Sequence, residues 1–176
     1  MRILFASLIG STIGFGLSAA GESLPMNADT WDVSDTGAAA FERIADRDAL
    51  CIQGGAALIK GMETRDGVLS VDILNTGTPH FGYLVFRARN GEHSEEVYLR
   101  MHKSRQLDAL QYNPHMNDEP NWQLFGSAQA SADFGHADWV TLQVAFAGDK
   151  AQATVVSEAG ETDLVIDDLA LDQSGS

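Results

Sequence analysis

The sequence is poor in cysteine and in basic residues. Cys51 is the only cysteine, so an intrachain disulfide is excluded even in a compartment that would permit one. It lies in an apolar run, residues 49–52, where a thiol is expected to be buried and unreactive. Lysine and arginine number 11 against 25 acidic residues, which gives a formal net charge of −14. Such a chain repels nucleic acid and anionic lipid, so neutral or cationic partners are expected.

Several signatures of catalytic and metal-binding proteins are also missing. No phosphate-binding loop, dinucleotide fingerprint or Ser/His/Asp nucleophile motif is present. The histidines lack the paired spacing of metal ligands; they are His80, His93, His102, His115 and His136. No metal or other cofactor is therefore predicted. Calcium in the acidic loops at 117–119 and 167–168 stays an alternative to simple solvation, which is favoured.

The apolar segment at the N-terminus has the form of a signal peptide. A positive start at Arg2 is followed by an apolar run at 3–17 and by small residues at 18–20. We predict cleavage after Ala20, because the run is too short for a comfortable membrane span. Cleavage would remove one base and no acid, leaving a formal charge of −15. The mature chain is expected to be exported to the periplasm or beyond the cell, without a transmembrane segment.

The rest of the chain predicts one all-β domain. Residues 21–30 are expected to form an irregular lead-in, 31–171 a single domain, and 172–176 a disordered polar tail. Short alternating runs separated by turn residues are typical of antiparallel strands, and about eleven of them without a convincing helix indicate a two-sheet sandwich. The expected strands cover 31–34, 49–53, 57–60, 67–75, 81–89, 95–102, 109–113, 122–125, 138–147, 151–157 and 164–166. Residues 38–46 are ambiguous, because their alanines suit a helix although a strand suits the neighbouring segments better.

The stretch from 81 to 102 predicts a hairpin with one apolar and one polar face. Side chains alternate along a strand, so Leu84 and Phe86 share a face with Val97 and Leu99 if the two apolar faces coincide. With a loop at 90–94, the expected register places Arg89 opposite Glu96, Arg87 opposite Tyr98 and Tyr83 opposite His102. If this sheet is curved, polar side chains turned away from the core would gather in a groove: Asp72, Arg87, Glu96, Arg100, His102, Gln111 and Gln143.

Four runs carry a resemblance to a known superfamily. They are G-Y-L-V-F-R-A-R, E-E-V-Y-L-R-M-H-K-S, D-A-L-Q-Y-N-P and N-W-Q-L-F. The chain resembles a bacterial exported family of the concanavalin A-like lectin/glucanase superfamily, near 3-keto-disaccharide hydrolase domains and laminin-G-like domains. The resemblance covers 31–169 and is strongest at 82–124. It implies a jelly-roll sandwich whose concave sheet faces a ligand, commonly a glycan.

Carried onto this chain, the resemblance marks a set of family-like positions: Phe86, Arg87, Glu96, Tyr98, Arg100, His102, Ser104, Asp108, Gln111, Tyr112 and Trp122. Two loops depart from the family pattern. Residues 103–107 stand where relatives tend to have a glycine-containing turn, and the loop at 114–121 is acidic. Both loops would border the groove, so the identity of the ligand is not carried over.

Binding of a sugar is the function that these residues favour. A pyranose offers an apolar face to aromatic rings and pairs of hydroxyls to planar or charged groups. The candidate ligand-binding residues are Tyr83, Arg87, Glu96, Tyr98, Arg100, His102, Gln111 and Trp122. A purely structural interpretation competes with this one, because ion pairs such as Arg89–Glu96 mimic sites and Trp122 could fill the core.

Two further functions stay open. Hydrolysis of a glycoside needs two carboxyl groups roughly 5 to 9 Å apart. The E-x-D-x-x-E row of glucanases on this fold is absent, although Asp72 and Glu96 could face each other across the groove with His102 as a base. A hydrolase or lyase acting on a sugar is therefore one alternative. An envelope module whose arginines meet an acidic partner protein is the other.

Overall fold

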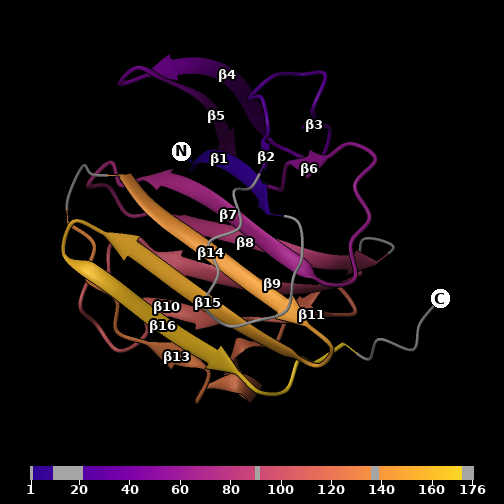
Figure 1. Ribbon diagram of the computed structural model, residues 1–176, viewed down its shortest axis with the longest axis vertical. Coiled ribbons are helices and arrows are strands. Elements are labelled where there is room, and N and C mark those ends of the chain that lie inside the picture. The colour runs from indigo at the N-terminus through magenta and orange to yellow at the C-terminus, as the bar shows by residue number, and fades with distance from the viewer. Residues whose placement is uncertain (1, 10–21, 90–91, 136–138, 172–176) are drawn as a thin grey trace.

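The computed structural model describes residues 2–9, 22–89, 92–135 and 139–171, and it has an all-β fold. The described part of the chain contains sixteen strands, no α-helix and one short 3-10 helix, η1 (Trp122–Phe125). Figure 1 shows how the strands are arranged. All strand pairings among the described residues are antiparallel, as the sequence predicts. No helix in the described ranges has the length and apolar character needed to cross a membrane.

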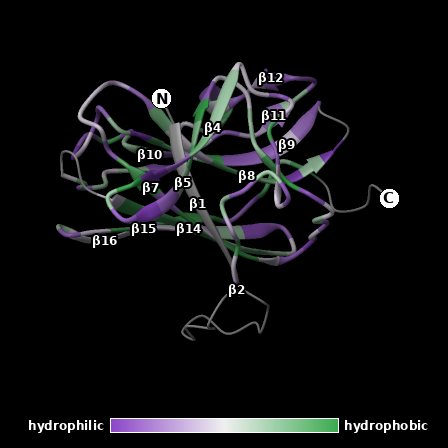
Figure 2. Cartoon of the chain, turned by 90° about the horizontal axis from the view of Figure 1, so that it is seen from above, coloured by the Kyte–Doolittle hydropathy of each residue, from purple (hydrophilic) through white to green (hydrophobic). Residues whose placement is uncertain are grey.

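The largest sheet has the order β16-β15-β14-β7-β1-β5-β4, and β2 is attached to β1. Its strands are β1 (Arg2–Ile9), β2 (Glu22–Ser23), β4 (Ala38–Ile44), β5 (Arg47–Gln53), β7 (Gly67–Leu74), β14 (Trp139–Ala147), β15 (Lys150–Ser157) and β16 (Gly160–Ile166). Along β14, residues with even numbers are buried and those with odd numbers are partly exposed, as the alternation predicts. Figure 2 shows hydrophobic (green) and hydrophilic (purple) portions in β14 and β15 of this sheet.

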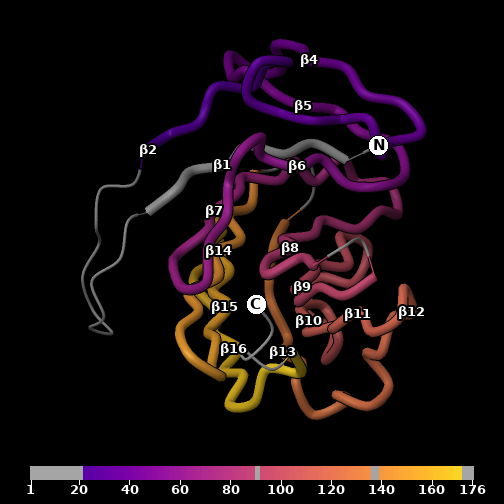
Figure 3. The backbone as a smooth tube through the Cα atoms, turned by 90° about the vertical axis from the view of Figure 1, so that its right-hand side faces the viewer, coloured from indigo at the N-terminus to yellow at the C-terminus, as the bar shows by residue number. Residues whose placement is uncertain are grey.

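A second sheet has the order β12-β11-β9-β10-β13, with β8 paired to β9. Its strands are β8 (Phe81–Arg89), β9 (His93–Arg100), β10 (Leu110–Tyr112), β11 (His115–Met116), β12 (Glu119–Pro120) and β13 (Gln129–Ala130). Two short strands, β3 (Trp31–Asp32) and β6 (Leu58–Ile59), form a third sheet. In Figure 3 the strands β7, β14, β15 and β16 lie on one side of the body and β8, β9, β10 and β11 on the other.

The main hydrophobic core lies between these two groups of strands. Val71 and Ile73 of β7 and Val140, Leu142 and Val144 of β14 belong to the same cluster of buried residues as side chains of β8, β9 and β10. The second sheet contributes Phe86, Val97, Leu99, Leu110 and Tyr112. The apolar faces predicted for the central hairpin therefore do face the core.

A smaller cluster lies beside the main one. It contains Met26, Trp31, Leu50 and Ile52 and is packed against by the partly buried Ile59. These residues come from the lead-in, β3, β5 and β6, so the hairpin β4–β5 and the small sheet form a second apolar region, at the top of Figure 1. Cys51 of β5 is buried, and burial raises the pKa of its thiol, which agrees with the expectation of an unreactive cysteine.

The signal peptide and the polar tail predicted from the sequence lie at the two ends of the chain. β1 pairs with both β5 and β7 and falls within the segment predicted to be a signal peptide. The predicted cleavage point after Ala20 and the predicted tail at 172–176 lie outside the described residues. Cleavage and export stay predictions.

Two local expectations were wrong. The run W-Q-L-F at 122–125 forms the 3-10 helix η1 and not a strand, because a four-residue run is too short for its periodicity to decide between the two. The segment 114–120, expected to be a loop, contains the small hairpin β11–β12. Its turn residues Asn117 and Asp118 both have positive φ, which asparagine and aspartate tolerate better than most residues.

The predicted register of the central hairpin was also wrong. Tyr83 lies opposite Tyr98 and Phe86 opposite Glu95, a displacement of four residues from the expected pairing. The cause is the connection: β9 begins at His93, inside the expected loop, and a β-bulge interrupts β8 between Phe86 and Arg89. An even displacement leaves each side chain of the regular part on its predicted face.

Candidate functional site

The face of β8, β9 and β10 turned away from the core collects most of the predicted site residues. Tyr83 lies opposite Tyr98, and Tyr98 lies opposite Gln111, so these three side chains share one face of the sheet. Phe81 lies opposite Arg100 on the same face. Together with Trp122 of η1 these residues are called the arginine–aromatic face: Phe81, Tyr83, Tyr98, Arg100, Gln111 and Trp122.

The guanidinium of Arg100 is at the centre of a fixed polar network. Nη1 donates to Gln111 Oε1, to Asp108 Oδ2 and to the Asp108 carbonyl oxygen, at 2.8, 2.8 and 2.9 Å. Nη2 donates to the hydroxyl of Tyr98 at 2.7 Å, and this hydroxyl donates to Gln111 Oε1 at 2.8 Å. Charged hydrogen bonds of this kind hold a planar group in one orientation. Tyr98 and Gln111 are buried, so the network is rigid before any ligand arrives.

Lys103 and Asp108 extend the network at its edge. Lys103 Nζ lies 2.6 Å from Asp108 Oδ2, and this hydrogen bond, with Arg100 beside it, holds the pKa of Asp108 below its ordinary value. Burial raises the pKa of Tyr98 to about 12 although Arg100 acts in the opposite direction. The phenol of Tyr98 is therefore neutral at pH 7, beside the ion pairs that Asp108 makes with Arg100 and Lys103.

Aromatic rings surround the guanidinium. The carbon at the centre of the Arg100 guanidinium lies 5.0 Å from the ring centroid of Tyr98 and 5.8 Å from that of Trp122. Phe81 contacts three rings, with centroids 5.9 Å from Tyr83, 5.8 Å from Tyr98 and 5.6 Å from His102. Trp122 is 38% exposed, so it does not fill the core.

A chain of hydrogen bonds positions Trp122. Its backbone nitrogen donates to Asn113 Oδ1 at 3.0 Å, and Asn113 Nδ2 donates to Glu96 Oε1 at 2.7 Å. Glu96 Oε1 also lies 3.7 Å from His115 Nε2, and the nearby carboxylate raises the pKa of His115. Glu96 is therefore on the predicted face, but it acts as a buried anchor for the segment that carries Trp122.

Arg87 does not join the arginine–aromatic face, contrary to the expectation that it would lie opposite Tyr98. Its φ of 51° belongs to the bulge in β8, which turns the side chain to the core side of the sheet. The guanidinium lies 5.4 Å from the ring centroid of Phe146, and its nitrogens donate to the Arg65 carbonyl oxygen at 2.9 Å and to Asp66 at 3.2 Å. The alternation of polar and apolar residues in the sequence does not predict this bulge.

The carboxylate pair considered for hydrolysis is not assembled. Asp72 accepts hydrogen bonds from Arg47 and Thr141 on the outer face of the first sheet, while Glu96 lies on the outer face of the second. The main core separates the two, because both side chains point away from it. His102 follows the end of β9 and packs on Phe81, not beside Glu96.

A pocket of about 730 Å³ lies along the edge of β8 that is not paired to β9. Tyr83, Arg87 and Glu96 are among its lining residues, with apolar side chains of β6, β7 and β8. It is called the β8-edge pocket below. Within the described ranges, no three histidine, cysteine, aspartate or glutamate side chains are grouped so that they could hold a metal ion.

Comparison of the chain with family models, with curated protein sequences and with solved structures gives no match.

The site contains residues that were not among the predicted eight. Asp108 fixes Arg100, Asn113 fixes Trp122, and Phe81 supplies a ring. The alternation held a signal for two of them, because Phe81 is in phase with Tyr83 and Asn113 is in phase with Gln111. Asp108 was marked only by the resemblance, as a family-like position. Asp108 lies before β10, and the alternation of a strand does not reach it.

Proposed function

We propose that the protein is an exported carbohydrate-binding module that holds a glycan, or another polyhydroxylated small molecule, on the arginine–aromatic face. The supporting observation is the position of Arg100: its planar guanidinium is fixed by Asp108 and Gln111 beside the exposed ring of Trp122. A ring binds the apolar face of a sugar, and a fixed planar donor orients the hydroxyls beside it. Both parts of such a subsite are in place without rearrangement.

The proposal includes the fold inferred from the resemblance. A jelly-roll sandwich of the concanavalin A-like type presents one sheet to its ligand, as in lectins and laminin-G-like domains. Support comes from the core shared by the two groups of strands and from the placement of the aromatic and arginine side chains on the outer face of a single sheet. Of the predicted ligand-binding residues, the proposal keeps Tyr83, Tyr98, Arg100, His102, Gln111 and Trp122. It assigns Glu96 to positioning and leaves Arg87 out.

Preorganisation is the physical reason for favouring binding over a purely structural role. When binding must first order flexible side chains, the loss of their conformational entropy lowers the affinity for the ligand. Arg100 makes four hydrogen bonds within the protein, and Tyr98 and Gln111 are buried beneath it. Trp122 is exposed beside this network and belongs to none of the hydrophobic clusters of the described residues, so its ring is available for stacking on a sugar.

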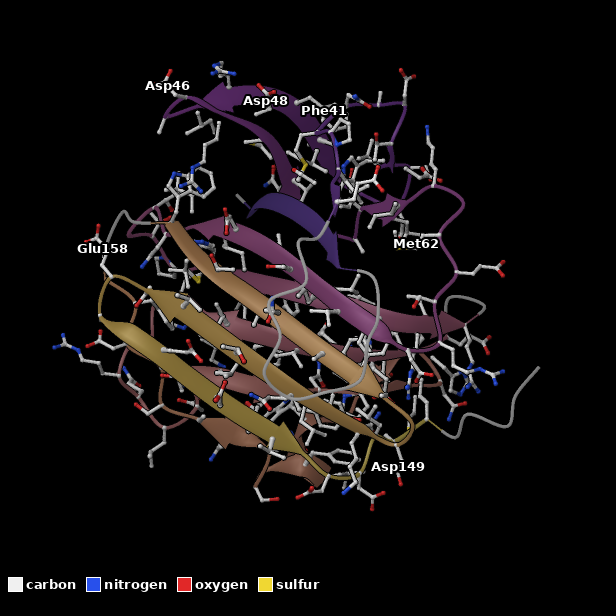
Figure 4. The ribbon with its side chains drawn as sticks, in the orientation of Figure 1. Phe41, Asp46, Asp48, Met62, Asp149 and Glu158 are labelled. Atoms are coloured by element: carbon white, nitrogen blue, oxygen red, sulfur yellow. The ribbon has the colours of Figure 1, made fainter. Side chains whose placement is uncertain are left out.

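Binding to a glycan library, with product analysis, tests the proposal. The wild-type protein is expected to give a saturable signal that falls at least tenfold in Arg100→Ala and persists in Arg43→Ala. Arg43 is a suitable control because it pairs with Asp48 at the exposed hairpin β4–β5, the region of Asp48 in Figure 4. No glycan should be converted to product.

Three results would contradict the proposal. Equal glycan binding by the wild type and by Arg100→Ala would show that the arginine–aromatic face is not the binding site. Release of product from a glycan or keto-sugar library would favour the hydrolase or lyase alternative. A blank library combined with a salt-sensitive interaction with an acidic envelope protein would favour the interaction module, because surface ion pairs weaken as salt rises.

A further inference from the structure

The strand β1 has a central place in the first sheet, although it falls in the segment predicted to be removed as a signal peptide. Six of its residues pair with residues 68–73 of β7, and three pair with residues 50–52 of β5. Figure 1 shows β1 between these two strands, and within the described residues β5 and β7 do not pair with each other. The place between them that residues 2–9 fill is called the β1 position. Removal of residues 1–20 opens two strand edges in the middle of a sheet.

The two edges belong to buried parts of β5 and β7. Leu50 and Ile52 are buried in β5, and Val71 and Ile73 are buried in β7. In an antiparallel pair every second residue directs its N–H and C=O groups toward the neighbouring strand. Such groups are nearly always paired in native proteins, and an open edge is a template on which another strand pairs. The β1 position therefore presents two templates that face each other.

Side-chain contacts hold β5 at the distance of one intervening strand from β7. Arg47 Nη1 of β5 donates to Asp72 Oδ2 of β7 at 2.8 Å, and the guanidinium carbon lies 5.0 Å from the ring centroid of Trp139. Leu50 packs with Trp31 in the smaller cluster, and β5 is paired with β4 along its whole length. These contacts do not involve β1, so its removal leaves them in place. Direct pairing of β5 with β7 would have to break them.

The β8-edge pocket adjoins the β1 position on the core side of the sheet. Ile52 of β5 and Leu69 and Val71 of β7 line this pocket of about 730 Å³, and each of the three lies opposite a residue of β1. Leu84 and Phe86 line it from β8. A strand in the β1 position directs every second side chain toward this space. The lining favours apolar side chains there.

We infer that the β1 position binds an extended, mostly apolar strand of another protein once residues 1–20 have been removed. The bound strand runs antiparallel to β5 and β7, and the unprocessed chain blocks the site with its own residues 2–9, which are apolar except for Arg2 and Ser7. A second copy is not the expected donor, because the apolar runs of the described residues after β1 are built into their own sheets. The inference rests on the cleavage that belongs to the proposed export, and not on sugar binding.

Binding of a labelled peptide to the exported protein tests the inference. Mass spectrometry first determines where the exported chain begins, and Gly21 is the expected residue. The peptide has the sequence of residues 2–9 followed by lysines for solubility. Fluorescence anisotropy should show saturable binding to the processed protein. The full chain that keeps residues 1–20 should bind the peptide more weakly by about tenfold or more, because a tethered strand competes at high effective concentration.

Matched peptide variants test the register. A peptide seated like β1 places position 6 opposite Val71, on the pocket side, and position 7 opposite Ser70, on the other face. Ala6→Lys in the peptide should weaken binding by about tenfold or more, because it brings a charge to an apolar space. Ser7→Lys in the peptide should not weaken binding.

Cross-linking shows where the peptide lies. Cys51, the only cysteine of the chain, is in β5 directly opposite residue 3 of β1. A peptide with Ile3→Cys should form a disulfide with Cys51 under mild oxidation, because directly opposite side chains of an antiparallel pair lie close together. A peptide with Ala6→Cys should not, and the Cys51→Ser protein should give no adduct.

Four results would overturn the inference. They are an exported chain that keeps residues 1–20, equal peptide binding by the processed and full chains, equal effects of the two lysine substitutions, and no peptide binding by the processed protein, as a monomer or as a dimer that fills the position itself. If the processed chain does not fold alone, its refolding is compared with and without peptide. Recovery with the unchanged peptide but not with Ala6→Lys supports the inference, and no recovery contradicts it. Glycan binding is measured on the same preparation, so a blank glycan library with intact peptide binding contradicts only the proposed function.

Discussion

The hydroxyl of Tyr112 donates a hydrogen bond of 2.5 Å to Glu95 Oε2, and both side chains are fully buried in the main core. Glu95 Oε1 accepts a second hydrogen bond from the backbone nitrogen of Leu171, and the Tyr112 oxygen accepts one from Ala170. The carboxyl group thus ties β9 and β10 to the C-terminal segment after β16. Burial raises the pKa of Glu95, although the hydrogen bond from Tyr112 acts against this shift.

Glu95→Gln tests the cost of this buried carboxylate. A raised pKa means that the folded protein binds the proton more tightly than the unfolded chain, so stability is lost as pH rises from the ordinary value of 4.5 through the raised pKa. Glutamine does not ionise. The unfolding free energy of Glu95→Gln relative to wild type should therefore increase with pH across this window, as measured by urea denaturation. Exposed Glu161→Gln is the control, and an equal pH dependence in both variants would contradict the assignment.

Gly82 is predicted to be required where β8 crosses β7. An added Cβ would lie 2.5 Å from Ile73 Cδ1 and 3.0 Å from Cγ2, and Ile73 is buried. Gly82→Ala should therefore destabilise the protein by about 1 to 3 kcal/mol through overpacking. Gly126→Ala, where the nearest atom is 3.8 Å away, should change the unfolding free energy much less. Adding Ile73→Val should recover part of the loss; failure to do so would show that the contact is not the cause.

His115 should give a pH-dependent contribution to stability. The carboxylate of Glu96, 3.7 Å away, raises the pKa of His115, so the stabilisation is complete below the ordinary value of 6.5 and is lost as pH rises through the higher folded value. The side chain is 29% exposed, which limits the effect to about 1 kcal/mol or less. His115→Gln should lower the melting temperature at pH 5.5 more than at pH 8.5. The same loss at both values would mean that the charged form is not stabilised.

Asn113 is predicted to be a positioning residue for the proposed site. Asn113→Ala removes the acceptor for the Trp122 backbone nitrogen and the donor to Glu96, without touching a ligand on the exposed ring. Glycan affinity is expected to fall severalfold, and the anisotropy of tryptophan fluorescence should drop as Trp122 becomes mobile. Unchanged anisotropy together with lost glycan affinity would indicate that Asn113 contacts the ligand directly and does not act by positioning Trp122.

Strand positions were largely predictable from sequence, because alternation of polar and apolar side chains directly reports burial. It located β7, β8 and β14 and put Tyr98, Arg100 and Gln111 on one face. The burial of Glu95 was also predictable but was not predicted. Glu95 is in phase with Val97 and Leu99, so its side chain faces the core.

The bulge at Arg87 was not predictable in this way. It depends on contacts of the guanidinium with Arg65, Asp66 and Phe146, which are distant in sequence. The register of the hairpin followed from that bulge and from the shorter connection to β9, so a rule based on periodicity gave the correct faces with the wrong partners. Trp122 was among the predicted ligand-binding residues, but the 3-10 helix that carries it was not predicted. Its position depends on the hydrogen bond from its backbone nitrogen to Asn113 and not on a pattern in the sequence.

The most direct measurement of the central claim is the affinity of Trp122→Ala for the best glycan found with the wild-type protein, compared with that of Leu124→Ala. Both side chains are exposed and belong to η1, so the two variants change the same short helix. Calorimetry should show a loss of about tenfold or more for Trp122→Ala, the amount expected from losing one stacked ring, and no significant change for Leu124→Ala. Equal affinities in the two variants would contradict sugar binding on the arginine–aromatic face.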